Sequence, residues 1–189
     1  MSKLKITHIV KLTPDFLEVD GRRVAEAVAG EPLLTQLYHA FKLDYPKFFK
    51  MDVLCKVGLL ASEALLEAEG GERFVPCADR AVILFNRHSS LHADKTFQQT
   101  IADLQDFYPK PSVFVYTLPN IVTGEIAIRN KYHGESEFIL LPEKSETAME
   151  QAVGRAFLDP ETKSVLTGWL EAVSEGEFEA EIRLCVRES

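Results

Sequence analysis

The stretch "YTLPNIVTGEIAIRNKYHGESEFILLPE", residues 116–143, decides the fold that the sequence predicts. It begins as a loop, continues as an amphipathic helix, turns at a glycine and then runs as a strand. The strand ends abruptly at Pro142-Glu143. A segment of this kind usually delivers a reactive group after its strand, and here it delivers none.

Outward from this segment, strands alternate with helices. We expect strands at 4–12, 80–86, 164–169 and 178–186, a short strand or turn at 16–24, and helices at 32–43, 51–68, 92–108 and 145–157. The run "RAVILFN" (80–86) has a continuous apolar centre from Ala81 to Phe85, as in a parallel strand buried on both faces. The pattern predicts one α/β domain over 1–189, with a mixed, mostly parallel sheet and helices on both faces.

The composition limits the classes of function and partner that we expect for the chain. The chain has 189 residues, of which 46% are hydrophobic and 26% charged, in the range of a globular domain with its own core. A formal net charge of −8 repels phosphate and anionic lipid, so we expect no nucleic-acid partner and no membrane association. No apolar stretch approaches the ~20 residues of a membrane span.

The three cysteines have neither CxxC nor metal-ligand spacing, and the start "MSKLKITHIVKL" lacks the apolar region of a signal peptide. We therefore expect a reduced, cytoplasmic protein. Cys55 and Cys185 fall in apolar patterns and read as core residues, whereas Cys77 is expected to be the most exposed thiol. Trp169 reads as a packing residue.

Several short motifs in a fixed order resemble one family. Lys50-Met51-Asp52 opens a helix rich in alanine and leucine, the strand 80–86 follows, and the opening stretch comes next. This order resembles the N-terminal half of a β-ketoacyl-[acyl-carrier-protein] synthase of the thiolase fold, over about residues 50–172. The family's segment before its nucleophile is matched by Pro119, Asn120, Gly124, Ala127, Ile128, Arg129 and Gly134. "SVLTGWLEA" (164–172) is similar to a later strand that ends in a Gly-Gly-x-Glu-Ala turn, with Trp169 in place of the second glycine.

The departures from the family bear on activity. Where the resemblance implies an Ala-Cys nucleophile at a helix N-terminus, this chain has Pro142-Glu143. The two catalytic histidines of such enzymes lie in the family's second half, which this chain would not reach. We therefore expect no catalytic residue, with Glu143 near the nucleophile's position, and no cofactor. The resemblance implies a non-catalytic partner of a synthase or acyl carrier protein in a fatty-acid or polyketide-type pathway.

The resemblance also suggests a docking surface. The basic residues Lys42, Lys47, Lys50 and Lys56 stand out in an acidic chain. Lys47 and Lys50 occupy the place where the family faces its acidic carrier protein. A solvated helix start, balanced by Asp44 and Asp52, explains them equally well. A free-standing acyl or carrier-protein binding module is therefore an alternative function.

A different class of function rests on "NRHSSLHAD" (86–94), where His88, His92 and Asp94 crowd together after a strand. They suggest a small acyl-thioester enzyme or a metal site. A loop in which Ser or Asp caps the next helix is the simpler interpretation, and we expect no metal. Glu143 and Glu146 near a helix start likewise read as residues favoured by the helix dipole.

The strand Glu137–Leu141 leads to a prediction about assembly. In the thiolase fold the corresponding strand pairs with its copy across a two-fold axis. The run is apolar and would be an aggregation hazard as an uncovered edge. We predict a dimer, with itself or with a full-length ketosynthase, through Phe138, Leu140 and Ile126. The alternative is that the final strand (178–186) covers this edge and leaves a monomer.

Overall fold

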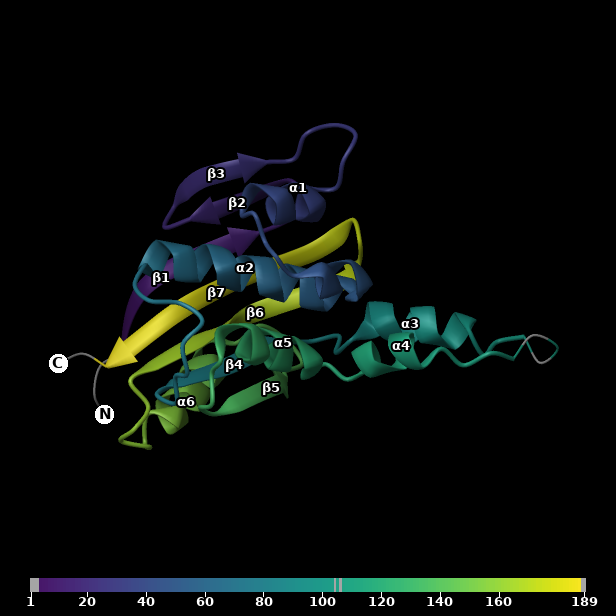
Figure 1. The fold of residues 1–189 in the computed structure, drawn as a ribbon. Helices are drawn as coiled ribbons and strands as arrows, with labels where there is room; N and C mark the ends of the chain where they lie inside the picture. The colour runs from purple at the N-terminus through teal and green to yellow at the C-terminus, as the bar shows by residue number, and fades with distance from the viewer. Residues whose placement is uncertain (1–3, 104, 106, 188–189) are drawn as a thin grey trace.

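The protein is built around one seven-stranded sheet with helices on both faces (Figure 1). The computed structural model describes residues 4–103, 105 and 107–187. The strands are β1 (Leu4–Leu12), β2 (Phe16–Val19), β3 (Arg22–Glu26), β4 (Arg80–Asn86), β5 (Ser136–Leu140), β6 (Ser164–Ser174) and β7 (Glu177–Arg187). The helices are α1 (Leu33–Ala40), α2 (Val53–Glu69), α3 (Leu91–Gln99), α4 (Pro111–Phe114), α5 (Ile121–Asn130) and α6 (Glu146–Ala156), with the 3-10 turns η1 (Pro46–Lys50) and η2 (Val115–Thr117).

The strand order is β3-β2-β1-β7-β6-β4-β5, which confirms a mixed sheet. Among the strands that the structure describes, β4 pairs in parallel with β5 and with β6, and the other four strand pairings are antiparallel. The expectation of a mostly parallel sheet was therefore wrong in this detail. A meander from β1 to β3 and a hairpin from β6 to β7 add strands that need no helical crossover.

Helix α2 lies at the centre of one face of the sheet (Figure 1). It begins where the Lys-Met-Asp motif predicts, because the carboxylate of Asp52 accepts hydrogen bonds from the backbone N–H groups of Leu54 at 3.2 Å and Cys55 at 3.1 Å. All residues from Val53 to Leu66 except Lys56 are buried, which explains why the helix is apolar nearly all round. Helices α1 and α5 pack on the same face.

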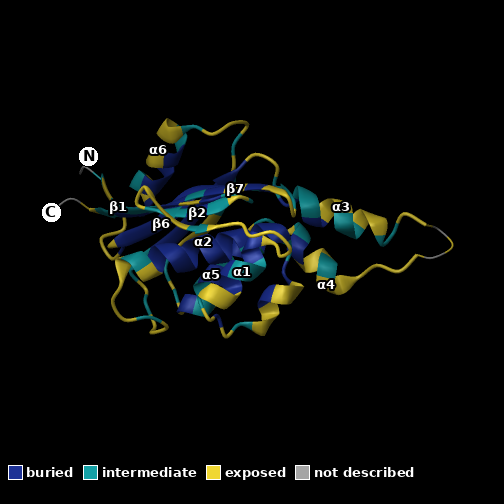
Figure 2. Cartoon of the chain, turned by 90° about the horizontal axis from the view of Figure 1, so that it is seen from above, coloured by how far each residue is buried: buried dark blue, intermediate teal, exposed yellow. Residues whose placement is uncertain are grey.

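Helix α6 covers the opposite face of the sheet, as Figure 2 shows. Its apolar stripe packs on β4 and β6, and Met149 and Phe157 are among its buried residues. Trp169 on β6 belongs to this cluster and is 4% exposed, which confirms its packing role. In the described part of the chain, α6 thus covers one face of the sheet, whereas α1, α2 and α5 cover the other.

Two predicted elements differ from the structure. The helix expected at 92–108 ends at Gln99, and residues 104 and 106 of that range lie outside the described residues. α3 and α4 project from the body (Figure 1), so apolar side chains beyond α3, such as that of Phe107, which is 57% exposed, have no core surface on which to pack.

The segment 164–172 is continuous strand, not a strand ending in a turn. β6 runs on to Ser174 and returns as β7. Gly168 is needed there because an added Cβ would lie 2.0 Å from the carbonyl oxygen of Glu181 on the neighbouring strand.

Candidate functional site

The segment between β5 and α6 stands where the resemblance places a nucleophile. Glu143 is exposed and lies outside the helix. Ser145 is the N-cap of α6, and its hydroxyl accepts a hydrogen bond from the N–H of Ala148 at 3.4 Å. Glu146 lies in the first turn of α6, where the helix dipole favours a carboxylate, as predicted.

Four charged side chains surround this helix start and neutralise one another. Arg183 on β7 donates two hydrogen bonds to the carboxylate of Glu146, at 2.5 and 2.8 Å, and also pairs with Glu181. Lys144 Nζ lies 3.1 Å from Oε2 of Glu181. Sequence reasoning missed this cluster, although the alternation of β7 places Glu181 and Arg183 on one face of the sheet.

The pKa shifts fix the charges of this cluster. Hydrogen bonding to Arg183 lowers the pKa of Glu146, and the same contact raises the pKa of Arg183. Burial opposes ionisation of Glu181, but hydrogen bonds from Arg183 and Lys144 outweigh it and lower its pKa. Glu146 and Glu181 therefore stay ionised and Arg183 stays protonated at neutral pH, so none of these three groups is a poised acid or base.

The three thiols lie elsewhere in the fold. Cys55 in α2 and Cys185 in β7 are buried, and Cys77 before β4 is partly exposed, as predicted. Burial raises the pKa of all three, that of Cys185 to about 11. The Cys77 thiol also donates to Oδ1 of Asp79 at 3.1 Å, which favours the neutral form. None of these thiols has the lowered pKa of a nucleophilic cysteine.

The loop after β4 does not bring its histidines and aspartate together. His88 Nδ1 lies 2.9 Å from Oε2 of Glu171 on β6, a partner that sequence reasoning missed. His92 has a buried Nδ1 without a hydrogen-bond partner among the described residues, and Asp94 is exposed. Within the described ranges no group of three His, Cys, Asp or Glu could hold a metal.

Ser90 occupies the N-cap position of α3, but its hydroxyl donates to the carbonyl oxygen of Thr117 and does not cap the helix. Asn86 and Ser89 exchange two hydrogen bonds, at 2.8 and 3.0 Å. The loop is thus braced by structural contacts.

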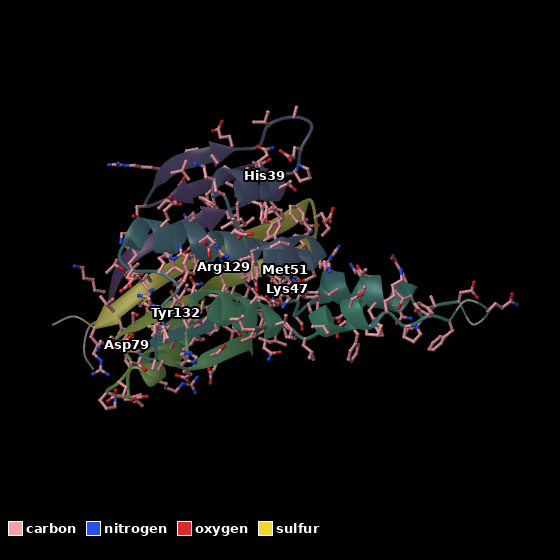
Figure 3. The ribbon with its side chains drawn as sticks, viewed as in Figure 1. His39, Lys47, Met51, Asp79, Arg129 and Tyr132 are labelled. Atoms are coloured by element: carbon pink, nitrogen blue, oxygen red, sulfur yellow. The ribbon has the colours of Figure 1, made fainter. Side chains whose placement is uncertain are left out.

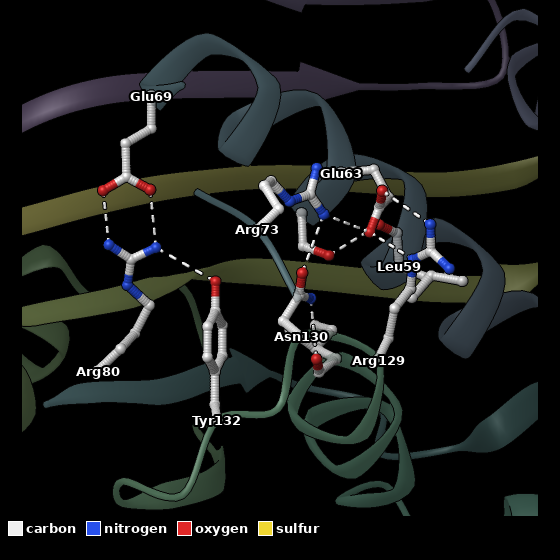
Figure 4. Close-up of polar contacts among 10 residues, drawn as sticks. Leu59, Glu63, Glu69, Arg73, Arg80, Arg129, Asn130 and Tyr132 are labelled. Carbon is white, nitrogen blue, oxygen red and sulfur yellow. Dashed lines mark hydrogen bonds and ion pairs between the residues drawn. The ribbon is translucent and has the colours of Figure 1, made fainter. Parts of the chain in front are cut away.

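Arg129, one of the residues that match the family's segment before its nucleophile, joins α5 to α2 (Figure 4). Arg129 donates to the buried carboxylate of Glu63, with Nε 2.7 Å from Oε1. Arg73 donates to the same oxygen at 2.9 Å and to Oδ1 of Asn130 at 2.9 Å. Gly134 lies so close to β4 that an added Cβ would be 2.3 Å from the carbonyl oxygen of Arg80.

The two lysines of the expected docking surface differ in their contacts. Lys47, labelled in Figure 3, lies near Met51 at the start of α2. It forms an ion pair with Glu125, whose side chain is only 4% exposed and also accepts a hydrogen bond from the Tyr45 hydroxyl at 2.9 Å. Burial and this hydrogen bond raise the pKa of Tyr45 to about 12. Lys50 is exposed. The charge that balances Lys47 is thus Glu125, and not the Asp44 or Asp52 that sequence reasoning considered.

The strand β5 lies at one edge of the sheet, next to β4. The final strand does not cover it, because β7 lies between β1 and β6, so the monomer alternative in that form was wrong. Leu140 is 52% exposed and Phe138 partly buried. Ile126, also predicted at an interface, is fully buried because it points from α5 into the core, so that assignment was wrong.

Comparisons with solved structures identify the fold. One match is a chain of the ishigamide ketosynthase/chain length factor, with a TM-score of 0.66, 16% identity, and coverage of 97% of this chain and 62% of that one. A second is a chain of the ketosynthase ApeO in complex with its chain length factor ApeC from Xenorhabdus doucetiae, with a TM-score of 0.67, 14% identity, and coverage of 100% and 80%. A third is a beta-ketoacyl synthase from Burkholderia phymatum STM815, with a TM-score of 0.63, 11% identity, and coverage of 100% and 60%.

The protein therefore has the thiolase-like fold of the ketosynthases and chain length factors, as the motif resemblance predicted. It spans about 60 to 80% of the lengths of these matched chains. No protein-family model and no curated protein matches the sequence. None of the helices in the described part of the chain is long and apolar enough to cross a membrane.

Proposed function

We propose that this protein is a non-catalytic, ketosynthase-like subunit that pairs with a ketosynthase in a fatty-acid or polyketide-type pathway. The observation that carries the proposal is the segment between β5 and α6. It holds Pro142-Glu143 where the resemblance implies a cysteine, and the charges around the start of α6 are tied into mutual ion pairs. The solved ketosynthases that occur together with a chain length factor support a partner role.

The proposed partner surface is the free edge of β5. Exposed Leu140 lies on this edge, and on the opposite face of the sheet Ile139 and Leu141 line a hollow of about 520 Å³ beside α6. An edge strand with apolar side chains favours pairing with another strand. The partner strand would come from a ketosynthase, and a second copy of this chain is the competing occupant.

Co-expression with a ketosynthase from the same organism tests this pairing. We expect co-purification of the two chains, lost on Leu140→Lys, because an ammonium group would be buried at the contact. Ile128→Lys is the matched control, since Ile128 is 69% exposed on α5 and lies outside the edge. If sedimentation shows that the purified chain self-associates, the homodimer is favoured. If the chain is a monomer and co-purifies with no ketosynthase, the partner role is refuted.

The non-catalytic role has its own test. Incubation with acyl thioesters should leave the intact mass of the protein unchanged, because none of the three thiols has a lowered pKa. A stoichiometric acyl adduct would show that the protein is a covalent acyl carrier or an enzyme.

Docking of an acidic acyl carrier protein is proposed as part of the same role, through Lys47 and Lys50. A ketosynthase solved with its acyl-carrier protein, the AntDE:AntF complex, supports this partner class at a TM-score of 0.58 and 14% identity. Lys50→Glu is the cleaner variant, because reversal at Lys47 would also leave buried Glu125 without its cation. Weaker binding with a flatter salt dependence is expected, and unchanged affinity would refute the docking surface.

A further inference from the structure

A pocket of mixed polarity lies beside α2, and we call it the arginine pocket. It measures about 630 Å³, within the ~300–1,000 Å³ of small-molecule sites. Its lining comes from the C-terminal half of α2, from the segments 41–44 and 70–74, and from Arg129 of α5. In the part of the chain that the structure describes, it shares no lining residue with the hollow beside α6. Its charged lining residues are Lys42, Asp44, Glu63, Glu67, Arg73 and Arg129.

The inner end of the pocket carries positive charge in excess. Arg73 and Arg129 both donate to Oε1 of Glu63, through Nη2 at 2.9 Å and through Nε at 2.7 Å, so two guanidinium groups flank a single carboxylate (Figure 4). Nη1 of each arginine makes no hydrogen bond to another described residue and is not a buried atom, so it remains accessible as a donor. A carboxylate is the group that such paired guanidinium donors recognise best.

A negative charge lies one helical turn away. Glu67 follows Glu63 by four residues on α2, so the two side chains share one stripe of the helix with their Cβ atoms about 5–6 Å apart. Glu67 is exposed and has no ion-pair partner among the described residues. Lys42 and Asp44 are also exposed in the lining, and their charges offset each other. The pocket therefore presents one unpaired charge of each sign.

The apolar part of the lining includes an exposed aromatic ring. Phe74 is 43% exposed, and its backbone has a φ of 62°, a left-handed conformation that bulky residues rarely adopt. Its ring centre lies 4.8 Å from Cζ of Arg73 and 5.1 Å from Cζ of Arg129. Leu43 and Leu66 add buried apolar surface to the lining. An aromatic group of a ligand can thus pack on Phe74 next to the guanidinium groups.

We propose that the arginine pocket binds a free α-amino acid with an aromatic side chain. The ligand's carboxylate accepts hydrogen bonds from Arg73 and Arg129, its ammonium group pairs with Glu67, and its ring packs on Phe74. The two charged groups of an α-amino acid are attached to one carbon, which suits charges one helical turn apart. A plain anion leaves Glu67 unpaired, and a plain amine meets the excess guanidinium charge. The proposal is independent of a ketosynthase partner.

Isothermal titration of the purified chain with phenylalanine and three analogues tests each contact. Phenethylamine lacks the carboxylate and should bind about tenfold more weakly or worse, because charged hydrogen bonds are lost. Phenylpropionate lacks the ammonium group and should bind about two- to fivefold more weakly, because an exposed ion pair contributes less. Alanine lacks the ring and should bind about tenfold more weakly.

Two surface variants assign the binding to this pocket. Glu67→Gln removes the unpaired carboxylate and should abolish the preference for phenylalanine over phenylpropionate. Glu150→Gln is the matched control, because Glu150 is also exposed on a helix but does not line the pocket. Phe74→Asn removes the ring while keeping a residue type that tolerates a left-handed backbone, and should reduce the affinity for phenylalanine to that for alanine.

Three outcomes would overturn the proposal. Phenylalanine that does not bind at millimolar concentration removes the site. Phenylpropionate that binds the parent chain as tightly as phenylalanine shows an anion site with no role for Glu67. A preference for phenylalanine that survives Glu67→Gln places the amino acid elsewhere on the molecule.

Discussion

The carboxylate of Glu63 is the junction on which the packing of α2 against α5 depends. Its Oε1 accepts hydrogen bonds from Arg73 Nη2 at 2.9 Å and Arg129 Nε at 2.7 Å, and its Oε2 accepts one from Arg129 Nη2 at 3.3 Å. The Glu63 side chain is 5% exposed. Glu63→Gln removes the negative charge, keeps the volume and leaves two guanidinium groups without a counter-ion.

The expected cost follows from burial. Removing one partner of a buried ion pair costs ~3–5 kcal/mol. The Arg129 side chain is 11% exposed and that of Arg73 is 21%, so water recovers part of the loss. We therefore expect the free energy of unfolding to fall by about 3 kcal/mol, which corresponds to a drop in Tm of ~6–12 °C for a domain of this size.

Urea unfolding of the parent and the variant measures this change, with an unchanged denaturant slope as the sign that only stability has altered. Glu67→Gln is the matched control, one turn further along α2 and exposed, and should change stability by no more than ~0.5 kcal/mol. A fall of less than ~1 kcal/mol for Glu63→Gln would show that Arg73 and Arg129 find other partners. The assignment of Arg129 as a structural link between α5 and α2 would then be wrong.

Three further predictions concern other parts of the fold. Burial raises the pKa of Asp52, so the folded state binds the proton of this carboxyl more tightly than the unfolded state does. Protonated Asp52 therefore adds stability below its unfolded pKa, and this stability is lost as the pH rises through its folded pKa. Asp52→Asn keeps the cap and should gain stability relative to the parent between pH 4 and 7 in pH-dependent urea unfolding, whereas a constant difference would contradict the shift. Gly134→Ala should destabilise by about 3 kcal/mol by clashing with the carbonyl oxygen of Arg80, while the unhindered Gly124→Ala should stabilise by up to ~1 kcal/mol; equal Tm values for the two variants would refute the close contact. In the folded protein only Cys77 should react with a thiol reagent, and slowly at neutral pH, with all three reacting in urea; rapid labelling of a second thiol without urea would contradict the burial of the cysteines.

The elements that were predicted well are those with a strong local pattern. Helix α2 has an N-cap aspartate, an apolar run and a terminal glycine, and β4 is apolar from Ala81 to Phe85, so each is specified by its own residues. The end of α3 was missed because the sequence past Gln99 is still compatible with a helix and includes apolar residues such as Ile101 and Phe107, whereas the core surface on which they could pack does not continue. Propensity alone cannot decide such an end.

The interface prediction failed at Ile126 for a reason that the sequence contained. In α5, Val122 and Ile126 are four residues apart and share the buried face, whereas Ile128 is turned by about 200° from Ile126 and is 69% exposed. The prediction treated these residues as one apolar surface and so ignored the 3.6-residue period of the helix. By contrast, the pairs Glu63–Arg73, Lys47–Glu125 and His88–Glu171 join distant segments, and no local pattern indicates them.

The charges around α6 bear on why the segment after β5 would not become a nucleophilic site by a single substitution. A thiolate at a helix N-terminus is stabilised by the helix dipole and by neighbouring cations. Here Lys144 and Arg183 are adjacent to that terminus, but Glu181 and Glu146 already neutralise them, and Glu146 also occupies the first turn of the helix. The positive potential that would lower the pKa of a thiol is thus offset by carboxylates held at hydrogen-bond distance. A cysteine at position 143 would meet a neutral cluster, so under the proposed non-catalytic role the carboxylate and guanidinium of β7 contribute as much as Pro142-Glu143.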